Sequence, residues 1–288
     1  MSWSRRRVLA CLAAAAAPAS AVAGSPGPVL WEVRDRGARV LLFGDNPAQR
    51  TPWRSDRVEA ALRASAVLWR ETPAKGGPAD TALFFAKGVD RARPLSSWLS
   101  QAERARVAAA AAAVGLGDAT LERFRPWLAS VALEEGFDAH AGFEAQNAPG
   151  SVLTAIAQAA GLPIRSEFPD TAAVVDYFAS LSAAAEVGAL LRAVDDIGAG
   201  PAAADREAQA WAVGDERADL AAVLHVRRAY PDYYQRMLVE RNHRWPARIR
   251  AMLDGGGASF VLVGSYHLVG PDGVPSQLAG AGMPARRI

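Results

Sequence analysis

A histidine near the carboxyl end of the chain carries the strongest signal of chemistry. His267 comes three residues after Gly264, which follows the strand-like run at residues 259–263. A buried strand that ends in glycine predicts a turn at the end of a sheet, where open α/β sheets place their sites. Imidazole is a common ligand of transition metals and the usual acid–base group near neutral pH. The alternative is a structural histidine bonded to a carbonyl, and these residues alone do not decide between the two.

A carboxylate is the second candidate. Glu71 closes an apolar segment at residues 66–69 and precedes a turn that contains Pro73. At the end of a strand, a carboxylate can bind a metal ion or act as a base. The alternative is a solvated acid that pairs with Arg70 or another arginine. Taken by itself, the segment favours this simpler interpretation.

An arginine and an asparagine form the third candidate. Arg241 and Asn242 lie in a predicted long helix that begins at Pro231 and ends near Leu253, before a run of three glycines. Both residues fall on or beside the apolar stripe of that helix. Five residues at helical spacing define the stripe: Tyr234, Leu238, Trp245, Ile249 and Met252. Because an unpaired buried charge is costly, Arg241 needs a carboxylate partner. It forms either a structural salt bridge or, with Asn242, part of a site that holds Glu71 or substrate.

The elements that must position these side chains form two strand-rich ends around a helical middle. Residues 29–33 and 39–43 predict a strand–turn–strand pair, Ser55 caps a helix to about residue 64, and residues 66–69 form another strand. Helices are predicted at residues 100–114, 120–135, 149–160, 171–198 and 202–226, with short strands at 162–164, 259–263 and 285–288. The fold class is therefore α/β (α+β). We expect a single domain with a central mixed sheet.

Five short motifs occur in a fixed order along the chain. They are Gly44-Asp-Asn-Pro47, Leu68-Trp-Arg-Glu71, Trp211-Ala-Val-Gly214-Asp215, Arg241-Asn242-x-x-Trp245 and Gly264-Ser-Tyr-His267-Leu-Val-Gly270. In order and approximate separation they resemble the TraB/GumN family, which includes the Tiki-type metalloproteases. The resemblance covers nearly the whole chain after its first segment.

The resemblance implies a site in which two histidines and a glutamate support divalent-metal-dependent peptide cleavage. His267 matches the second histidine, Glu71 the glutamate, and Arg241 and Asn242 the polar pair. The position of the first histidine is Pro47, whose side chain has no ligand atom. Asp45 and Asn46 are nearby oxygen donors, of which Asp45 is a possible metal ligand. Glu167 lies near the place where the family has another acid.

Two main hypotheses follow. The first is a peptidase-like hydrolase in which manganese, cobalt or zinc, bound by His267 and Glu71, activates water while Arg241 or Asn242 stabilises the oxyanion. The second is a non-catalytic family member that binds a peptide, glycan or small ligand in the former cleft, and Pro47 supports it. A third version is a metal-free hydrolase that uses Glu71 and His267 as an acid–base pair.

The first segment of the chain predicts export. Arg5, Arg6 and Arg7 precede an apolar run, and Ala21-Val22-Ala23 is a small-x-small cleavage signature. Residues 1–23 are therefore expected to be a cleaved secretory leader, and residues 24–288 the mature domain in the periplasm or outside the cell. The string Ser4-Arg-Arg-Arg-Val-Leu9 also resembles the twin-arginine signal.

Composition limits the partners of the mature chain. The formal charge of +2 becomes −1 when the leader removes three arginines and no acids, so the sequence gives no argument for nucleic-acid binding. Cys11, the only cysteine, also lies in the leader, which excludes disulfides and thiolate chemistry. No apolar run is long enough for a membrane span in the mature chain. A peptide or small molecule is the expected ligand.

Overall fold

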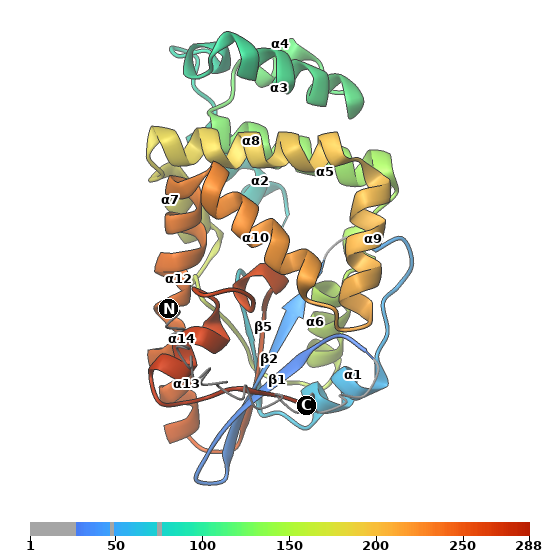
Figure 1. The fold of residues 1–288 in the computed structure, drawn as a ribbon, viewed down its shortest axis with the longest axis vertical. Coiled ribbons are helices and arrows are strands. Elements are labelled where there is room, and N and C mark those ends of the chain that lie inside the picture. Colours follow the sequence, from blue (N-terminus) through green and yellow to red (C-terminus); the bar gives the residue numbers. More distant parts are fainter. Residues whose placement is uncertain (1–26, 47–48, 74–76) are drawn as a thin grey trace, which may run out of the picture.

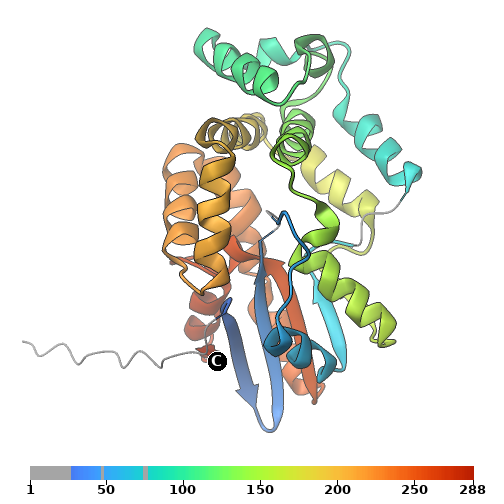
Figure 2. The same cartoon turned by 90° about the vertical axis from the view of Figure 1, so that its right-hand side faces the viewer.

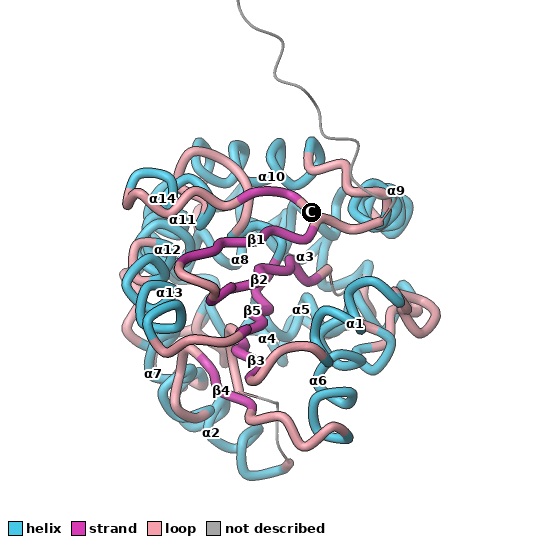
Figure 3. Tube along the Cα trace, turned by 90° about the horizontal axis from the view of Figure 1, so that it is seen from below, coloured by secondary structure: helices cyan, strands magenta, loops and turns pink. Residues whose placement is uncertain are grey.

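A six-stranded mixed sheet forms the centre of the protein. The structure is a computed structural model that describes residues 27–46, 49–73 and 77–288. The strands are β1 (Leu30–Asp35), β2 (Ala38–Asp45), β3 (Val67–Arg70), β4 (Ile164–Ser166), β5 (Ala258–Gly264) and β6 (Arg286–Arg287). Their order across the sheet is β4-β3-β5-β2-β1-β6 (Figures 1 and 3). The predicted α/β class with a central mixed sheet is confirmed.

Four neighbouring strands of this sheet run in the same direction. β2 and β3 are both parallel to β5, and β4 is parallel to β3, whereas β1 and β6 complete the sheet with antiparallel pairs. Asp45 at the end of β2 pairs with Gly264 at the end of β5. The two similar segments, an apolar strand followed by glycine, therefore lie side by side. The residues that follow all four strands emerge at one edge, where sites in such sheets are formed.

Successive side chains of β2 point alternately to the two faces of the sheet. Val40 and Leu42 pack with Trp245, Ile249 and Leu253 on one face. That face is covered by α13 (Trp245–Asp254) and α14 (Val274–Gly280), as Figure 3 shows. A strand buried on both faces must be apolar throughout, which explains the uninterrupted run in β2.

The opposite face of the sheet has a core of its own. Leu41 and Phe43 of β2 pack with Leu62, Leu153 and other residues of α1 (Asp56–Arg63) and α6 (Pro149–Ala159). Ser55 caps α1, as predicted, and its hydroxyl accepts a hydrogen bond from the Val58 N–H. Helices on both faces give the sheet the three-layer arrangement typical of α/β proteins.

A helical layer lies beyond the carboxyl edge of the parallel strands (Figures 1 and 2). It contains α2 (Pro78–Gly88), α3 (Gln101–Ala113), α4 (Asp118–Leu121), α5 (Pro126–Ala141), α7 (Thr171–Ala179) and α8 (Ala183–Ala199), with 3₁₀ turns at Leu95–Trp98 and Ala145–Asn147. Trp127, Leu133 and Leu190 are fully buried in its core. This layer therefore has its own apolar core, separate from the two beside the sheet.

Three of the predicted helices are wrong in extent, and two of these are each a pair of helices. The segment at 171–198 divides into α7 and α8, and Ser182 caps α8 by accepting a bond from the Ala185 N–H. The segment at 202–226 divides into α9 (Pro201–Ala212) and α10 (Arg217–Ala229). Gly214 between them has φ +77°, a left-handed conformation that ends a helix. Likewise, the predicted helix at 120–135 restarts at Pro126 as α5.

The long helix predicted from Pro231 to Leu253 is also interrupted. It consists of α11 (Pro231–Tyr234), a π-helical turn at Gln235–Val239, α12 (Glu240–Asn242) and α13. Pro246 has no N–H to continue the helical bonding, which accounts for the break before α13. π-Helical turns are rare and frequently occur at functional sites. Here Glu240 alone separates the turn from Arg241 and Asn242.

Within the described ranges, no single helix is long and apolar enough to cross a membrane. Only α7 and α8 taken together meet the length and composition, and they bend by 107° at their junction. The predicted leader at residues 1–23 lies outside the described residues.

Candidate functional site

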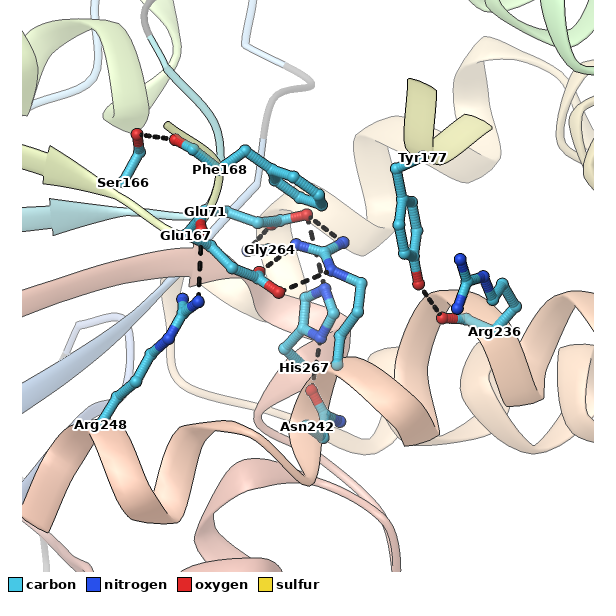
Figure 4. A network of polar contacts seen from close by, with 11 residues as sticks. Glu71, Ser166, Glu167, Phe168, Tyr177, Arg236, Asn242, Arg248, Gly264 and His267 are labelled. Carbon is cyan, nitrogen blue, oxygen red and sulfur yellow. Dashed lines mark hydrogen bonds and ion pairs between the residues drawn. The ribbon is translucent and has the colours of Figure 1, made fainter. Parts of the chain in front are cut away.

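Polar residues that follow three parallel strands meet at the carboxyl edge of the sheet. Glu71 follows β3, Glu167 follows β4, and His267 ends the 3₁₀ turn η4 (Ser265–His267) that follows β5. Figure 4 shows the three side chains directed toward one another, with Asn242 below the imidazole. Parallel strands bring these residues together although up to about two hundred residues separate them in the chain.

Arg241 joins the two carboxylates of this edge. Its Nη1 lies 2.8 Å from Glu71 Oε1, and its Nη2 lies 2.6 Å from Glu167 Oε2. The Nε atom is 3.4 Å from the second oxygen of Glu167, which makes that pair bidentate. The guanidinium is 4% exposed and lies 5.4 Å from the Phe168 ring. A cation this deeply buried is tolerated because two carboxylates surround it.

Glu71 is held in its ionised form. Its Oε2 accepts a hydrogen bond of 2.8 Å from the Gly264 N–H, while Oε1 faces Arg241. Burial alone would raise the pKa of Glu71, but the charges of Arg241 and His267 outweigh it and hold the pKa well below its usual value. A carboxylate therefore persists at neutral pH in a site that is largely shielded from water.

The turn after β5 does not depend on glycine at position 264 through its backbone conformation. The φ angle of Gly264 is −55°, which any residue can adopt, so no unusual turn is involved. A Cβ atom there would meet Glu71 Oε2 at 3.4 Å. That distance is an ordinary van der Waals contact, so a Cβ atom at position 264 would touch the Glu71 carboxylate without displacing it. At Gly44 the constraint is tighter, because a Cβ atom would lie 2.8 Å from the Ser265 Cα.

The His267 ring is oriented by Asn242. Its Nδ1 lies 2.6 Å from Asn242 Oδ1, and its Nε2 lies 3.5 Å from Glu71 Oε1. Asn242 Nδ2 donates to the Asp272 carbonyl at 2.8 Å, which leaves its oxygen to accept from the imidazole. In the neutral ring the Nδ1 therefore carries the proton, and Nε2 faces the Glu71 side of the site. The ring is buried, so this orientation is fixed by packing as well as by hydrogen bonds.

The structure brings Glu71, Arg241, Asn242 and His267 into one connected network. Asp45 lies at the neighbouring strand end, and its Oδ1 accepts a hydrogen bond from the Gly150 N–H at 3.0 Å. Burial raises the pKa of Asp45 to about 6, against the bond from Gly150 and the charge of Arg70. Pro47 lies outside the described residues. The roles assigned to these residues from the sequence stay predictions.

The donor set at this edge is small for a divalent cation. Glu71 Oε1 and His267 Nε2 are close enough to share a cation, but Oε1 already faces the guanidinium of Arg241. Among the residues that the structure describes, no three histidine, cysteine, aspartate or glutamate side chains are arranged to hold a metal ion. Catalytic zinc sites commonly have three protein ligands. The described residues therefore do not fit a tightly held cation.

Trp211 fastens the helix α9 to the end of β2. The indole Nε1 donates to the Gly44 carbonyl at 2.9 Å, and the ring is buried against Phe43. Gly214, three residues later, ends the helix. The Trp211–Asp215 motif thus positions α9 and α10 beside η4. Its Asp215 bonds with Arg217 and takes no part in the network of Arg241.

A buried carboxylate lies behind the turn that carries His267. Asp219 of α10 is 4% exposed, and its Oδ1 has no hydrogen-bond partner among the described residues. Burial raises the pKa of Asp219 to about 7, against a bond with Ser265 and with a further rise from the carboxylates of Glu207 and Glu216. Neither the spacing nor the composition of the sequence identifies this residue.

Glu167 is the site residue that sequence reasoning placed least well. Only the family resemblance pointed to it, and nothing in the local sequence connects it with Arg241. The one indirect signal for Glu167 in the sequence is Arg241, because a guanidinium on a buried helix face requires carboxylate partners. Its second partner follows β4, a strand of three residues whose alignment with β3 is a property of the sheet.

The fold and the site define a mixed α/β protein with a buried polar network at the carboxyl edge of its parallel strands. The model of the TraB/PrgY/gumN family matches residues 29–287, which is nearly the whole chain. The chain belongs to this family, and the predicted membership is confirmed. No curated protein matches the chain.

Replacing Arg241 tests how far the network depends on its cation. In Arg241→Met the carboxylates of Glu71 and Glu167 lose their counter-charge, so we expect a loss of about 3–5 kcal/mol in the free energy of unfolding at pH 8. At pH 5 the loss should be smaller, because protonation relieves the repulsion between the two acids. Urea denaturation at both pH values measures this. Arg244→Met, an exposed neighbour, should change stability by less than about 0.5 kcal/mol.

Asp219 should make stability depend on pH in the opposite direction from a paired acid. Its pKa is about 7 in the folded protein and near 3.8 in the unfolded chain. The folded state therefore keeps the proton longer, and its stability should fall as pH rises from about 4 to about 7. Asp219→Asn should flatten this decline in urea denaturation curves, whereas the exposed Asp232→Asn should not. An unchanged slope in Asp219→Asn would mean that Asp219 is ionised in the folded protein.

Proposed function

We propose that this family member is a hydrolase of peptide or related amide or ester bonds, with His267 as general base and Glu71 as its charged partner. One observation carries the proposal: Asn242 Oδ1 holds His267 Nδ1 at 2.6 Å while Nε2 faces Glu71. In many hydrolases, the base that activates the nucleophile is a histidine, and a hydrogen bond from another residue to its second ring nitrogen fixes its orientation. The peptide class rests on the family resemblance.

The proton path follows from this geometry. A water beside Nε2 gives its proton to His267 as it attacks the carbonyl carbon, and the resulting imidazolium then donates a proton to the leaving group. Glu71 stabilises that imidazolium, because its carboxylate stays ionised 3.5 Å from Nε2. Electrostatic stabilisation of this kind is effective where water is excluded.

Arg241 and Asn242 serve in this proposal as positioning residues. Both are buried, and the bonds of Arg241 to Glu71 and Glu167 already engage it on two sides. This differs from the expectation that one of them stabilises the oxyanion. Arg241 instead sets the charge and direction of the Glu71 carboxylate, and Asn242 selects the tautomer of His267.

A second candidate function is ligand binding without catalysis. The ion cluster of Glu71, Arg241 and Glu167 is complete without a substrate, as a purely structural cluster would be. In a binding protein, His267 and Asn242 would orient a ligand and leave it intact. Turnover is therefore the measurement that separates the two functions.

Hydrolysis of a mixed peptide library, read by mass spectrometry, tests the proposed function. We expect His267→Ala to lower kcat/KM by about 10²-fold or more, as loss of a general base does. Asn242→Ala should lower it as well and shift the pH profile, since the tautomer is no longer selected. His243→Ala, an exposed histidine on the same helical segment, should keep full activity. Peptide binding without turnover by the intact protein would favour the second candidate.

The divalent metal predicted from the family is best tested at position 47. We expect the intact chain to bind manganese, cobalt or zinc weakly, because Glu71 and His267 are only two donors. Pro47→His should bind at least about tenfold more tightly if it restores a third ligand. Calorimetric titration measures both, with Pro47→Ala as the control for loss of proline. Tight metal binding by the intact chain would show that Asp45 or Asn46 completes a metal site and that the cation belongs in the mechanism.

We also propose that the chain is exported and acts in the periplasm or outside the cell. The positive head, apolar run and Ala21-Val22-Ala23 signature support this proposal. N-terminal sequencing of protein from the periplasmic fraction should begin at or near Gly24. An intact Met1 on a protein that stays in the cytoplasm would contradict export.

A further inference from the structure

The turn η4, which carries His267, is attached to two helices that the proposed mechanism does not use. Helices α9 and α10 pack against each other, and α10 packs against η4 (Figures 1 and 2). The hydroxyl of Tyr266 donates a hydrogen bond to Glu207 Oε1, and Ser265 contacts the side chain of Asp219. These contacts hold the body of the turn, whereas Asn242 holds only the imidazole ring.

Asp219 and Glu207 are also in contact with each other. Asp219 of α10 is buried, and Glu207 of α9 is half-buried. Two carboxyl groups in contact share a proton, because two adjacent negative charges repel each other. With that proton on Asp219, a continuous series of contacts runs around the turn. We refer to its members as the η4 clamp: Ser265, Asp219, Glu207 and Tyr266.

A shared proton balances the charge of this clamp. Two carboxylates, Glu207 and Glu216, act on Asp219. Cations of the neighbouring segments pair with other acids: Arg287 with Glu216, Arg217 with Asp215, and Arg192 with Asp196, whose charge also reaches Tyr266. The contact between Asp219 and Glu207 therefore depends on the proton that they share.

The space beside Asp219 is too small for a ligand. Its Oδ1 has no hydrogen-bond partner among the described residues. With Gly44, Ser265 and Leu268, Asp219 lines a cavity of about 20 Å³, which has room for one water molecule. The carboxyl group therefore acts on the protein itself, through the contacts of the clamp.

The position of His267 depends on the position of this turn. η4 is a single 3₁₀ turn, closed by a hydrogen bond of 2.9 Å from the Leu268 N–H to the Ser265 carbonyl. Ser265 lies directly on the end of β2, because a Cβ atom at Gly44 would be 2.8 Å from the Ser265 Cα. A displacement of Ser265 therefore moves the imidazole relative to Asn242, two residues away from the clamp.

We propose that Asp219 is a positioning residue for His267, and that its protonated form joins Glu207 to η4 and so holds the imidazole on Asn242. This inference rests on the proposed function and adds a residue to it. Loss of the proton places two negative charges in contact, which loosens the clamp. The ring of His267 then loses its fixed orientation, and turnover falls as the pH rises.

The ionisation of Asp219 falls in the neutral range. Burial raises the pKa of Asp219 to about 7, and the carboxylates of Glu207 and Glu216 add to the rise. Asparagine has the shape of the protonated acid, and its amide group donates to Glu207 at any pH. Asp219→Asn therefore keeps the clamp closed where the native acid is ionised, and Asp219→Ala removes it.

Nuclear magnetic resonance of the histidine rings tests this inference without turnover. The chain has four histidines, and their nitrogen-15 signals report which ring nitrogen carries the proton. His267→Ala identifies the signal of His267. At about pH 9, where Asp219 is ionised, we expect a mixture of tautomers for His267 in the intact protein. Asp219→Asn should show the Nδ1–H form alone under the same conditions.

Kinetics give a second readout. The ratio of kcat for Asp219→Asn to kcat for the intact protein should rise from about 1 at pH 6 to about 3 or more at pH 9. Asp219→Ala should lower kcat by about tenfold or more and change KM by less than about twofold, because a displaced base slows the chemical step. Asp232→Asn, an exposed acid on α11, should leave the profile unchanged. Thermal melting of each variant checks that the fold is intact.

The outcomes separate this inference from the proposed function. The same tautomer of His267 in the intact protein and in Asp219→Asn at about pH 9 would overturn the inference, and so would a ratio of kcat values that does not change with pH. Hydrolysis with such a constant ratio would leave the proposed function standing. A change of tautomer in an intact protein that hydrolyses no peptide would support the clamp and refute the hydrolase.

Discussion

The buried pairing of Arg241 with Glu71 and Glu167 is the interaction on which the site depends. A guanidinium this far from water is stable only with carboxylates on its donors, and these come from the ends of two adjacent strands. Arg241 thereby joins a helix to the sheet and keeps Glu71 ionised beside His267. One ion cluster thus determines both the packing and the electrostatics of this edge.

Local backbone features serve this cluster. The π-helical turn at Gln235–Val239 precedes Arg241 and Asn242, which are both buried although they are adjacent in the chain. Tyr234 before the turn donates to the Asp272 side chain, and Asn242 after it donates to the Asp272 carbonyl. The irregular helix is therefore fastened on both sides to the loop that follows β5. The N–H of Gly264 at the end of β5 holds the Glu71 carboxylate with a hydrogen bond of 2.8 Å.

The site has two electrostatic halves with η4 between them. On the side of Arg241, the carboxylates are compensated by a cation and stay ionised. On the side of Tyr266, burial raises the pKa values of Asp196 and Asp219 to about 6 and 7, although Arg192 pairs with Asp196. The first half keeps Glu71 charged at neutral pH, whereas the second favours protonated carboxylates.

The sequence by itself determined the strands, the order of the motifs and most of the candidate residues. Apolar runs that end in glycine predicted β2 and β5, and the demand of a buried arginine for a carboxylate predicted a partner for Arg241. The breaks at Ser182 and Gly214 were missed, because alanine-rich segments have the same period on both sides of a break, and the break before α13 was missed although Pro246 marks it. Only the tertiary structure decided that Glu167 is the second partner of Arg241 and that the Oδ1 of Asp219 has no hydrogen-bond partner among the described residues. Both depend on strand register and on contacts between distant helices, which no local pattern records.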